Sequence, residues 1–230
     1  MNILQKYLEE RHKNQRKKQP AEPGPVVTIS REFGCSGKFL ADKIAYRLKQ
    51  EGRGEASKGK WKVISKEILE RSAKELELDP SHIEYVFNYE KKSAIDEILG
   101  ALSFKYYKSD RKIKNTIKNV IYTFGKQGNS IILGRGGSAI TRNIEKAVHI
   151  RLIAPLNWRT EVIKKRFQLD NKKARDYIID IDKKRAELRN EMAGVTVDDT
   201  HYDLIFNAQN FTYDEMTQII IEIMEMRKLI

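Results

Sequence analysis

The amino-acid sequence predicts an α/β fold in which helices cover both faces of a parallel sheet. Five short apolar runs alternate with longer amphipathic stretches, an order that is typical of strands and helices in such a sheet. The first run ends at a glycine-rich turn that leads directly into a helical pattern. Ligands of parallel sheets bind beyond the carboxyl ends of the strands, so this turn also indicates where a ligand would bind.

Composition favours one globular domain with a short appendage. The chain has 230 residues, of which 40% are hydrophobic and 33% are charged, and this size suits a single core. No apolar run approaches the roughly 20 residues that cross a bilayer, and the first residues lack an apolar signal segment. We therefore expect no membrane span and a cytoplasmic protein. Cys35 is the only cysteine, which also fits a reducing compartment.

The formal net charge of +12, from 44 lysines and arginines against 32 aspartates and glutamates, favours a polyanionic partner. Nucleotides, nucleic acids and acidic membrane surfaces all meet that condition. The sequence has no internal repeat and none of the cysteine, aromatic or glycine patterns that mark zinc fingers or RNA-binding sheets. A nucleic acid is therefore the less favoured partner.

Residues 1–25 are predicted to form a basic helix and a linker. Apolar residues alternate with charges from Ile3 to Leu8, a basic run follows, and three prolines between Pro20 and Pro25 mark the linker. One interpretation is an arm that docks on a second copy of the chain or on an acidic surface, and the other is a solvated terminus. Residues 26–230 form the predicted domain.

The elements of this domain follow one another along the chain. Strands are expected at 26–30, 61–64, 131–133, 148–153 and 204–206. Helical patterns occupy most of the chain between them: after Gly37, from 66 to about 76, from about 81 to about 127, from 158 to about 192 and from 213 to about 229.

The strongest local signal for chemistry is the turn SREFGCSGK, from Ser30 to Lys38. Its glycines let backbone N–H groups turn around phosphate oxygens, and the start of the helix adds partial positive charge. The residues that would line this phosphate-binding loop are Gly34, Cys35, Ser36, Gly37 and Lys38, the last neutralising the β- and γ-phosphates of a nucleotide. The strict pattern is incomplete, because Glu32 holds the first glycine position and Phe39 replaces the magnesium-binding hydroxyl residue. A plain strand-to-helix connection is the alternative.

A second glycine-rich turn, Gly134-Arg135-Gly136-Gly137, follows the third apolar strand. Its glycines leave space around the Arg135 guanidinium at the predicted crevice, and a planar fork of donors suits a phosphate group. The alternative is an arginine on the surface of a tight turn.

The strongly charged helices in the last third of the chain supply further candidates. Phosphoryl transfer needs positive charge around the transferred group, so a mobile pair of helices that carries arginines suits a lid. We retain Arg159, Arg166, Asp182 and Arg185 as candidates and assign most other charges to solvated faces.

Neither a zinc site nor a histidine nucleophile is indicated, because the four histidines have no ligand spacing. Cys35 lies beside a helix N-terminus, which would lower the pKa of its thiol, although a passive role is the simpler interpretation. The metal ligands are not identified. Phosphates and water would hold magnesium with help from Ser36, Glu32 or another carboxylate.

Together these stretches resemble the cytidylate-kinase-like family of bacterial P-loop proteins, from about Val26 to the C-terminal helix. The matching stretches are Ile29–Gly34 with Gly37, Ile132–Gly136, Ala154–Leu156 with Arg159, Ile181–Arg185 and Tyr202–Asn207. The resemblance implies a P-loop NTPase-type three-layer sandwich, whose five-stranded parallel sheet has helices on both faces. It also implies a helical acceptor-binding segment at roughly 66–126 and a lid within 156–192.

The same resemblance implies a reaction, namely magnesium-dependent transfer of the γ-phosphoryl group of ATP to a nucleoside monophosphate, CMP or dCMP. It also implies roles for six side chains: Lys38 with the 34–38 loop for the donor phosphates, Arg135 for the acceptor phosphate, Asp182 and Arg185 for the acceptor nucleotide, and Arg159 and Arg166 for the lid.

Two departures leave a second function open. True cytidylate kinases carry a fuller glycine loop with a threonine after the lysine, and their acceptor region does not align clearly between Trp61 and Tyr107. The alternative is therefore a catalytically weak or inactive regulator that binds a nucleotide or another polyanion. A third hypothesis, nucleic-acid binding through residues 1–20, predicts a steep salt dependence of binding.

Overall fold

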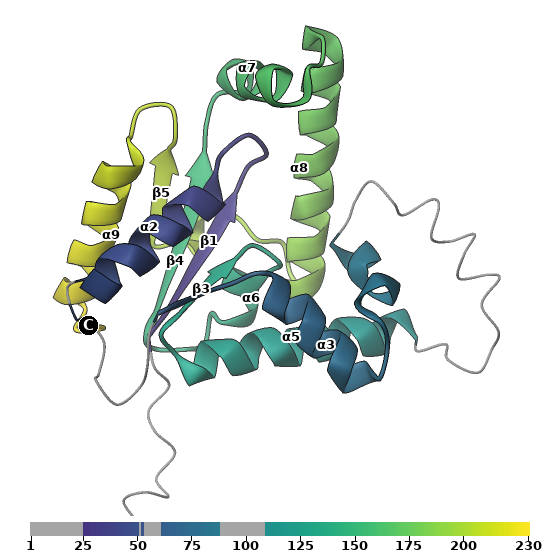
Figure 1. The fold of residues 1–230 in the computed structure, drawn as a ribbon, viewed down its shortest axis with the longest axis vertical. Helices are drawn as coiled ribbons and strands as arrows, with labels where there is room; N and C mark the ends of the chain where they lie inside the picture. The colour runs from purple at the N-terminus through teal and green to yellow at the C-terminus, as the bar shows by residue number, and fades with distance from the viewer. Residues whose placement is uncertain (1–24, 51, 53–60, 88–108) are drawn as a thin grey trace, which may run out of the picture.

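Five parallel strands form the sheet of the computed structural model, which describes residues 25–50, 52, 61–87 and 109–230 (Figure 1). The strands are β1 (Val26–Arg31), β2 (Lys62–Ile64), β3 (Ser130–Leu133), β4 (Ala147–Ile153) and β5 (Leu204–Asn207). They stand in the order β2-β3-β1-β4-β5, and each neighbouring pair is parallel. The five predicted strands are confirmed, each to within one residue at either end.

Helices occupy the connections. In chain order they are α2 (Gly37–Gln50), α3 (Lys66–Leu76), α5 (Asp110–Gln127), α6 (Gly137–Ile140), α7 (Leu156–Phe167), α8 (Asn171–Ala193) and α9 (Tyr213–Met226), with short 3-10 turns η1 (Pro80–His82), η2 (Glu84–Val86) and η3 (Asp199–His201). The helical prediction from about 81 to 127 is confirmed only from Asp110 onward. Tight 3-10 turns take up residues 80–86, and residues 88–108 lie outside the described ranges.

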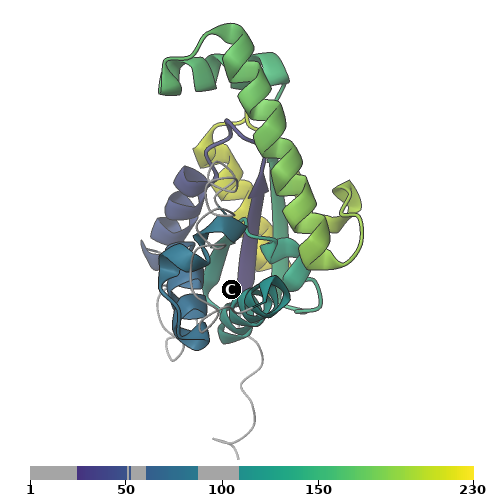
Figure 2. The ribbon, with the colours of Figure 1, turned by 90° about the vertical axis from the view of Figure 1, so that its right-hand side faces the viewer.

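Both faces of the sheet are covered by helices, so the predicted three-layer α/β sandwich with a five-stranded parallel sheet is confirmed (Figures 1 and 2). Helices α2 and α9 pack on one face, where Ile44 and Met216 join a cluster with Ile131 of β3. Helices α3, α5 and the C-terminal end of α8 pack on the other face with Ile132. Neighbouring residues of β3 thus belong to different clusters, because successive side chains of a strand point to opposite faces.

The long helix α8 extends beyond the sheet to the corner that it forms with α7 (Figures 1 and 2). The Asp170 side chain caps its first turn by accepting a hydrogen bond of 2.8 Å from the Lys173 N–H. Gly194 ends it in the left-handed conformation, at a φ of 74°. The single charged stretch predicted from 158 to about 192 is therefore two helices, separated after Gln168, which ends α7 at a φ of 54°.

The basic arm predicted for residues 1–25 falls outside the described residues except for Pro25. Its helix, its contact with a second copy of the chain and its use for nucleic acid therefore stay predictions. Helix α3 and all but the last residue of α5 lie within the segment 66–126, whose acceptor-binding role also stays a prediction. Within the described ranges, none of the helices combines the length and the apolar surface of a membrane span.

Candidate functional site

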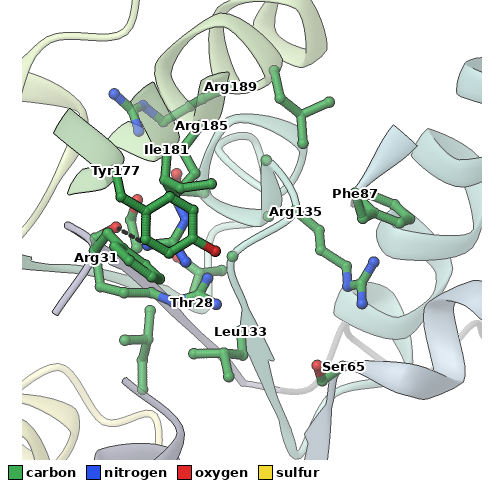
Figure 3. A pocket seen from close by; sticks show the side chains of 18 residues that line it. Thr28, Arg31, Ser65, Phe87, Leu133, Arg135, Tyr177, Ile181, Arg185 and Arg189 are labelled. Carbon is green, nitrogen blue, oxygen red and sulfur yellow. Dashed lines mark hydrogen bonds between the residues drawn. The ribbon is translucent and has the colours of Figure 1, made fainter. Parts of the chain in front are cut away.

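A cavity of about 280 Å³ opens at the carboxyl ends of β1, β2 and β3 (Figure 3). Its walls are the last residues of β1, the turn after β3, Phe87 and one face of α8. The chain leaves β1 toward β2 and leaves β3 toward β4, on opposite sides. The cavity therefore lies at a topological switch point, which is where parallel sheets bind ligands.

Four arginines line this cavity, which we call the arginine cavity: Arg31, Arg135, Arg185 and Arg189. None of the lining residues in the described part of the chain is acidic. Guanidinium groups are weakly hydrated and present a planar fork of donors that matches phosphate and carboxylate oxygens. The cavity is therefore suited to a small anionic ligand.

The turn after β3 is left-handed at three successive residues, with φ of 69° at Gly134, 57° at Arg135 and 72° at Gly136. A left-handed arginine is strained, and such strain persists where the surroundings enforce it, often at binding sites. The Arg135 guanidinium lies 3.9 Å from the centroid of the Phe87 ring, which fixes its direction (Figure 3). Gly136 allows close packing of α8, because a Cβ there would lie 2.7 Å from Met192 Cβ.

Arg31 and Arg185 meet at another side of the cavity. Arg185 Nη1 donates a hydrogen bond of 3.4 Å to the Arg31 carbonyl oxygen, and its guanidinium lies 5.2 Å from the centroid of the Phe33 ring. One helical turn further, Arg189 has a buried Nε that meets no hydrogen-bond partner among the described residues. An unsatisfied buried donor is uncommon in native proteins and marks a position for a ligand or a water.

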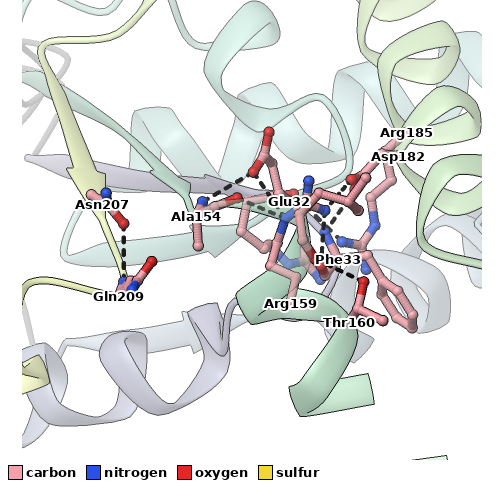
Figure 4. Close-up of polar contacts among 11 residues, drawn as sticks. Glu32, Phe33, Ala154, Arg159, Thr160, Asp182, Arg185, Asn207 and Gln209 are labelled. Atoms are coloured by element: carbon pink, nitrogen blue, oxygen red, sulfur yellow. Dashed lines mark hydrogen bonds and ion pairs between the residues drawn. The ribbon is translucent and has the colours of Figure 1, made fainter. Parts of the chain in front are cut away.

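The first glycine turn, between β1 and α2, is contacted by polar side chains of α7 and α8 (Figure 4). Arg159, only 7% exposed, donates to the Ala154 carbonyl oxygen at 2.9 Å and to the Phe33 carbonyl oxygen at 3.2 Å. The same guanidinium forms ion pairs with Asp182 at 2.5 Å and Glu32 at 3.3 Å. The Asp182 carboxylate also accepts a hydrogen bond of 2.6 Å from the Phe33 N–H. Both polar backbone groups of Phe33 are thus occupied.

The aromatic ring of Phe33 connects the same turn to the α7–α8 corner. Its centroid lies 5.0 Å from that of Tyr177 and 6.2 Å from that of Phe167. These rings adjoin a small buried cluster formed by Ile163, Ala174 and Ile178. The predicted lid is therefore packed directly on the first glycine turn.

Close packing also surrounds the next two residues of this turn. A Cβ at Gly34, whose φ is 103°, would lie 3.0 Å from Arg159 Cβ. Burial, with a smaller contribution from the Glu32 carboxylate, raises the pKa of the Cys35 thiol to about 12. This direction is opposite to the lowered pKa expected beside a helix N-terminus, because desolvation outweighs the partial charge of the helix.

Four of the six side chains predicted to act lie outside the arginine cavity, with Arg159 and Asp182 beside the first glycine turn and two others elsewhere. The Lys38 side chain is 72% exposed and pairs with Asp42, one turn further along α2, at 2.9 Å. Arg166 lies in the last turn of α7, with its guanidinium 5.3 Å from the centroid of the Phe167 ring. The structure thus brings Arg135 and Arg185 to the cavity and leaves Lys38, Arg159, Arg166 and Asp182 apart from it.

Sequence reasoning missed two of the four cavity arginines. Arg31 stands in the SREFGCSGK turn, but the phosphate-loop pattern assigns no role to a residue at that position. Arg189 lies four residues after Arg185 on the same helix, and this spacing places two side chains on one face. The spacing alone therefore predicts that Arg189 lies beside Arg185. No sequence pattern predicts that Phe87 contacts Arg135.

The match to a family model decides the family. The model described as "Cytidylate kinase-like family" matches residues 26–210, a stretch that holds the sheet, both glycine turns and α8. The chain belongs to the cytidylate kinase-like family. Membership of this family supports a nucleotide kinase-like role and does not identify the acceptor substrate.

Among solved structures, this cytidylate kinase-like chain resembles an uncharacterized protein from Eubacterium ventriosum ATCC 27560. The TM-score is 0.60 at 20% sequence identity, over 87% of this chain and 98% of that one, which shows a shared fold. A shikimate kinase from Bacteroides thetaiotaomicron gives a TM-score of 0.48 at 11% identity over the same shares of the two chains.

A partial match links the chain to a uronate isomerase of Corynebacterium glutamicum. The two are 30% identical over 97 residues, which are 40% of this chain and 18% of that protein. The match spans less than a fifth of the length of the isomerase, so the activity of the isomerase does not carry over to this chain.

Proposed function

We propose that the protein is a phosphotransferase that moves the γ-phosphoryl group of ATP to a nucleoside monophosphate, with CMP or dCMP as the preferred acceptor. The arginine cavity carries this proposal. It lies at the carboxyl ends of three parallel strands and is lined by four arginines, with no acid among the described lining residues. The acceptor phosphate, a dianion, matches that charge and that donor geometry.

Arg135 and Arg185 are proposed to bind the acceptor phosphate from two directions. Each guanidinium is held by a neighbouring aromatic ring, that of Phe87 or Phe33. Phosphoryl transfer relies on positioning and electrostatic stabilisation, with little covalent help from the protein. Guanidinium groups fixed before the ligand arrives supply both, because they need no reorganisation when charge develops.

The donor phosphates are assigned to the Gly34–Lys38 loop. In the described conformation Arg159 and Asp182 bond the backbone of Phe33 beside this loop, and a movement of the α7–α8 corner is proposed to admit the donor. Lys38 would then leave its exposed pair with Asp42, a step that costs less than about 1 kcal/mol for a surface ion pair. Arg166, on the moving corner, would approach the donor phosphates as a lid residue.

Magnesium enters this proposal only with the donor nucleotide. No group of three or more histidine, cysteine, aspartate or glutamate side chains is arranged to hold a metal ion within the described ranges. Glu32 is paired with Arg159, and Ser36 offers one exposed hydroxyl at the turn. Magnesium keeps most of its waters in such sites and is then bound mainly by the phosphates.

A nucleotide-binding regulator without useful catalysis is the second candidate. The observation in its favour is the closed first glycine turn, together with Phe39 in place of the hydroxyl residue. The Phe39 ring packs edge-on against Tyr213, with centroids 4.8 Å apart. This candidate predicts that ATP or a monophosphate binds and that no phosphoryl group is transferred.

A coupled assay of ADP formation tests both candidates. The full chain is given ATP, magnesium and each nucleoside monophosphate, alongside Lys38→Ala, Arg135→Ala and the control Lys173→Ala, whose side chain is 74% exposed. The phosphotransferase predicts turnover on CMP or dCMP, a higher acceptor KM for Arg135→Ala and a lower kcat for Lys38→Ala. Binding in calorimetry without turnover on any monophosphate supports the regulator. The absence of any nucleotide binding contradicts both candidates.

A further inference from the structure

The Arg31 side chain extends between the two glycine turns. A Cβ placed on Gly37 would lie 3.3 Å from Arg31 Cδ, and a Cβ placed on Gly134 would lie only 2.0 Å from Arg31 Nη1. Carbon and nitrogen atoms that are not bonded do not approach so closely. The Arg31 guanidinium therefore keeps its place only because residue 134 has no side chain.

Gly134 needs to be glycine for a second reason, because its φ is 69°. Gly194 serves as a control, since it shares the positive φ but lacks the close contact. Gly194 has nearly the same φ, 74°, but no atom lies within 4 Å of a Cβ built there. An alanine at either position strains the backbone to a similar degree. An alanine at 134 alone also displaces Arg31.

The turn that supports Arg31 is tied to the strand that carries it. The Gly134 N–H donates a hydrogen bond of 3.0 Å to the Ile29 carbonyl oxygen, two residues before Arg31. Arg185 donates to the Arg31 carbonyl oxygen at 3.4 Å, so the two arginines are coupled. Both line the arginine cavity.

We propose that Arg31 binds the phosphate of the ligand in the arginine cavity and that Gly134 positions it for this role. The inference rests on the proposed function and deepens it, since it adds a phosphate ligand from the strand β1 to those from the turn after β3 and from α8. A phosphate monoester or a diphosphate is the ligand class, because several guanidinium groups in one cavity are stabilised by an anion of more than one charge.

Calorimetric titration of the full chain with inorganic pyrophosphate tests this assignment without requiring turnover. Arg31→Ala and Gly134→Ala are each expected to weaken binding about tenfold or more, as expected for a lost charge-assisted hydrogen bond. The double variant is expected to bind no more weakly than Arg31→Ala, because both changes remove one interaction. Gly194→Ala is expected to bind like the wild type.

Several results would overturn the proposal. Wild-type affinity in Arg31→Ala with a lower thermal midpoint would show that Arg31 only holds the two turns together. Equal losses in Gly134→Ala and Gly194→Ala, or additive losses in the double variant, would contradict the positioning role. Failure of the wild type to bind pyrophosphate would also overturn it. If Arg31→Ala does not fold, Arg31→Lys keeps the charge without the fork and is expected to show a smaller loss.

The coupled assay separates this inference from the proposed function. Turnover by Arg31→Ala with an unchanged acceptor KM would overturn the role of Arg31 and leave the phosphotransferase intact. The expected pyrophosphate pattern without turnover by the wild type would keep Arg31 as a phosphate ligand and remove the phosphotransferase.

Discussion

The two glycine turns both follow a strand and place glycines beside a cation, yet their surroundings in the structure differ. In the turn after β1 the backbone N–H and carbonyl of Phe33 are bonded to Asp182 of α8 and Arg159 of α7, whereas the turn after β3 faces the arginine cavity. Glycines beside a cation show where something can approach the backbone closely. They do not show whether the chain itself already fills that place.

The largest effect is expected from breaking the closed turn with Arg159→Ala. The carboxylates of Glu32 and Asp182, each 25% exposed, would lose their cation, and we expect a loss of about 3 kcal/mol in the free energy of unfolding. This is the lower end of the range for broken buried pairs. Urea unfolding measures it, with Lys173→Ala expected to change stability by less than about 0.5 kcal/mol. A loss below 1 kcal/mol for Arg159→Ala would mean that this network does not hold the turn.

The open turn is tested by Arg135→Ala, whose effect should appear in binding more than in stability. A lost hydrogen bond between charged groups is worth about 1.5–3 kcal/mol, so CMP affinity should fall about 10- to 100-fold in calorimetry. The lost contact with Phe87 should cost about 1 kcal/mol of stability. Phe87→Leu, which leaves Arg135 in place without its ring, should weaken CMP binding less. An equal loss in both variants would place the binding role elsewhere.

The buried thiol of Cys35 predicts that the free energy of unfolding depends on pH. The pKa of the Cys35 thiol is about 12 in the folded chain, whereas its ordinary value, which applies to the unfolded chain, is 9.0. The resulting contribution to stability is complete below pH 9 and is lost as the pH rises from 9 toward 12. Urea unfolding at pH 8, 9.5 and 10.5 should therefore show a steeper loss for the wild type than for Cys35→Ala. Parallel losses would show that the thiol is not buried as described.

The smallest effect on stability is expected from Lys38→Ala. An exposed pair one helical turn apart contributes little, so the free energy of unfolding should change by less than about 0.5 kcal/mol. If the first turn opens to accept ATP, the same variant should still lower kcat tenfold or more in the coupled assay. An unchanged kcat in an active enzyme would show that Lys38 does not act on the donor phosphates.

The strands were predictable because each is a local apolar run, as Ile131 and Ile132 of β3 illustrate. The four-residue helix α6 and the 3-10 turns around Ile83 were not, since elements of that length have no periodic pattern. Likewise, Arg135 was found beside its own glycines. The ion pair of Arg159 with Glu32 was not predictable, because the two residues lie 127 positions apart in the chain and only the fold brings them together.

Helix α8 gives the molecule a mechanical property. Its 23 residues span about 34 Å and include neither glycine nor proline at which it would bend. Asp182 near its middle engages the first glycine turn, whereas Met192 at its far end packs on Gly136 of the second. A straight helix moves as one body, so a tilt that separates Asp182 from the first turn would also shift Met192 against Gly136 of the second. Under the proposed function, binding of the donor and binding of the acceptor would then be coupled through α8.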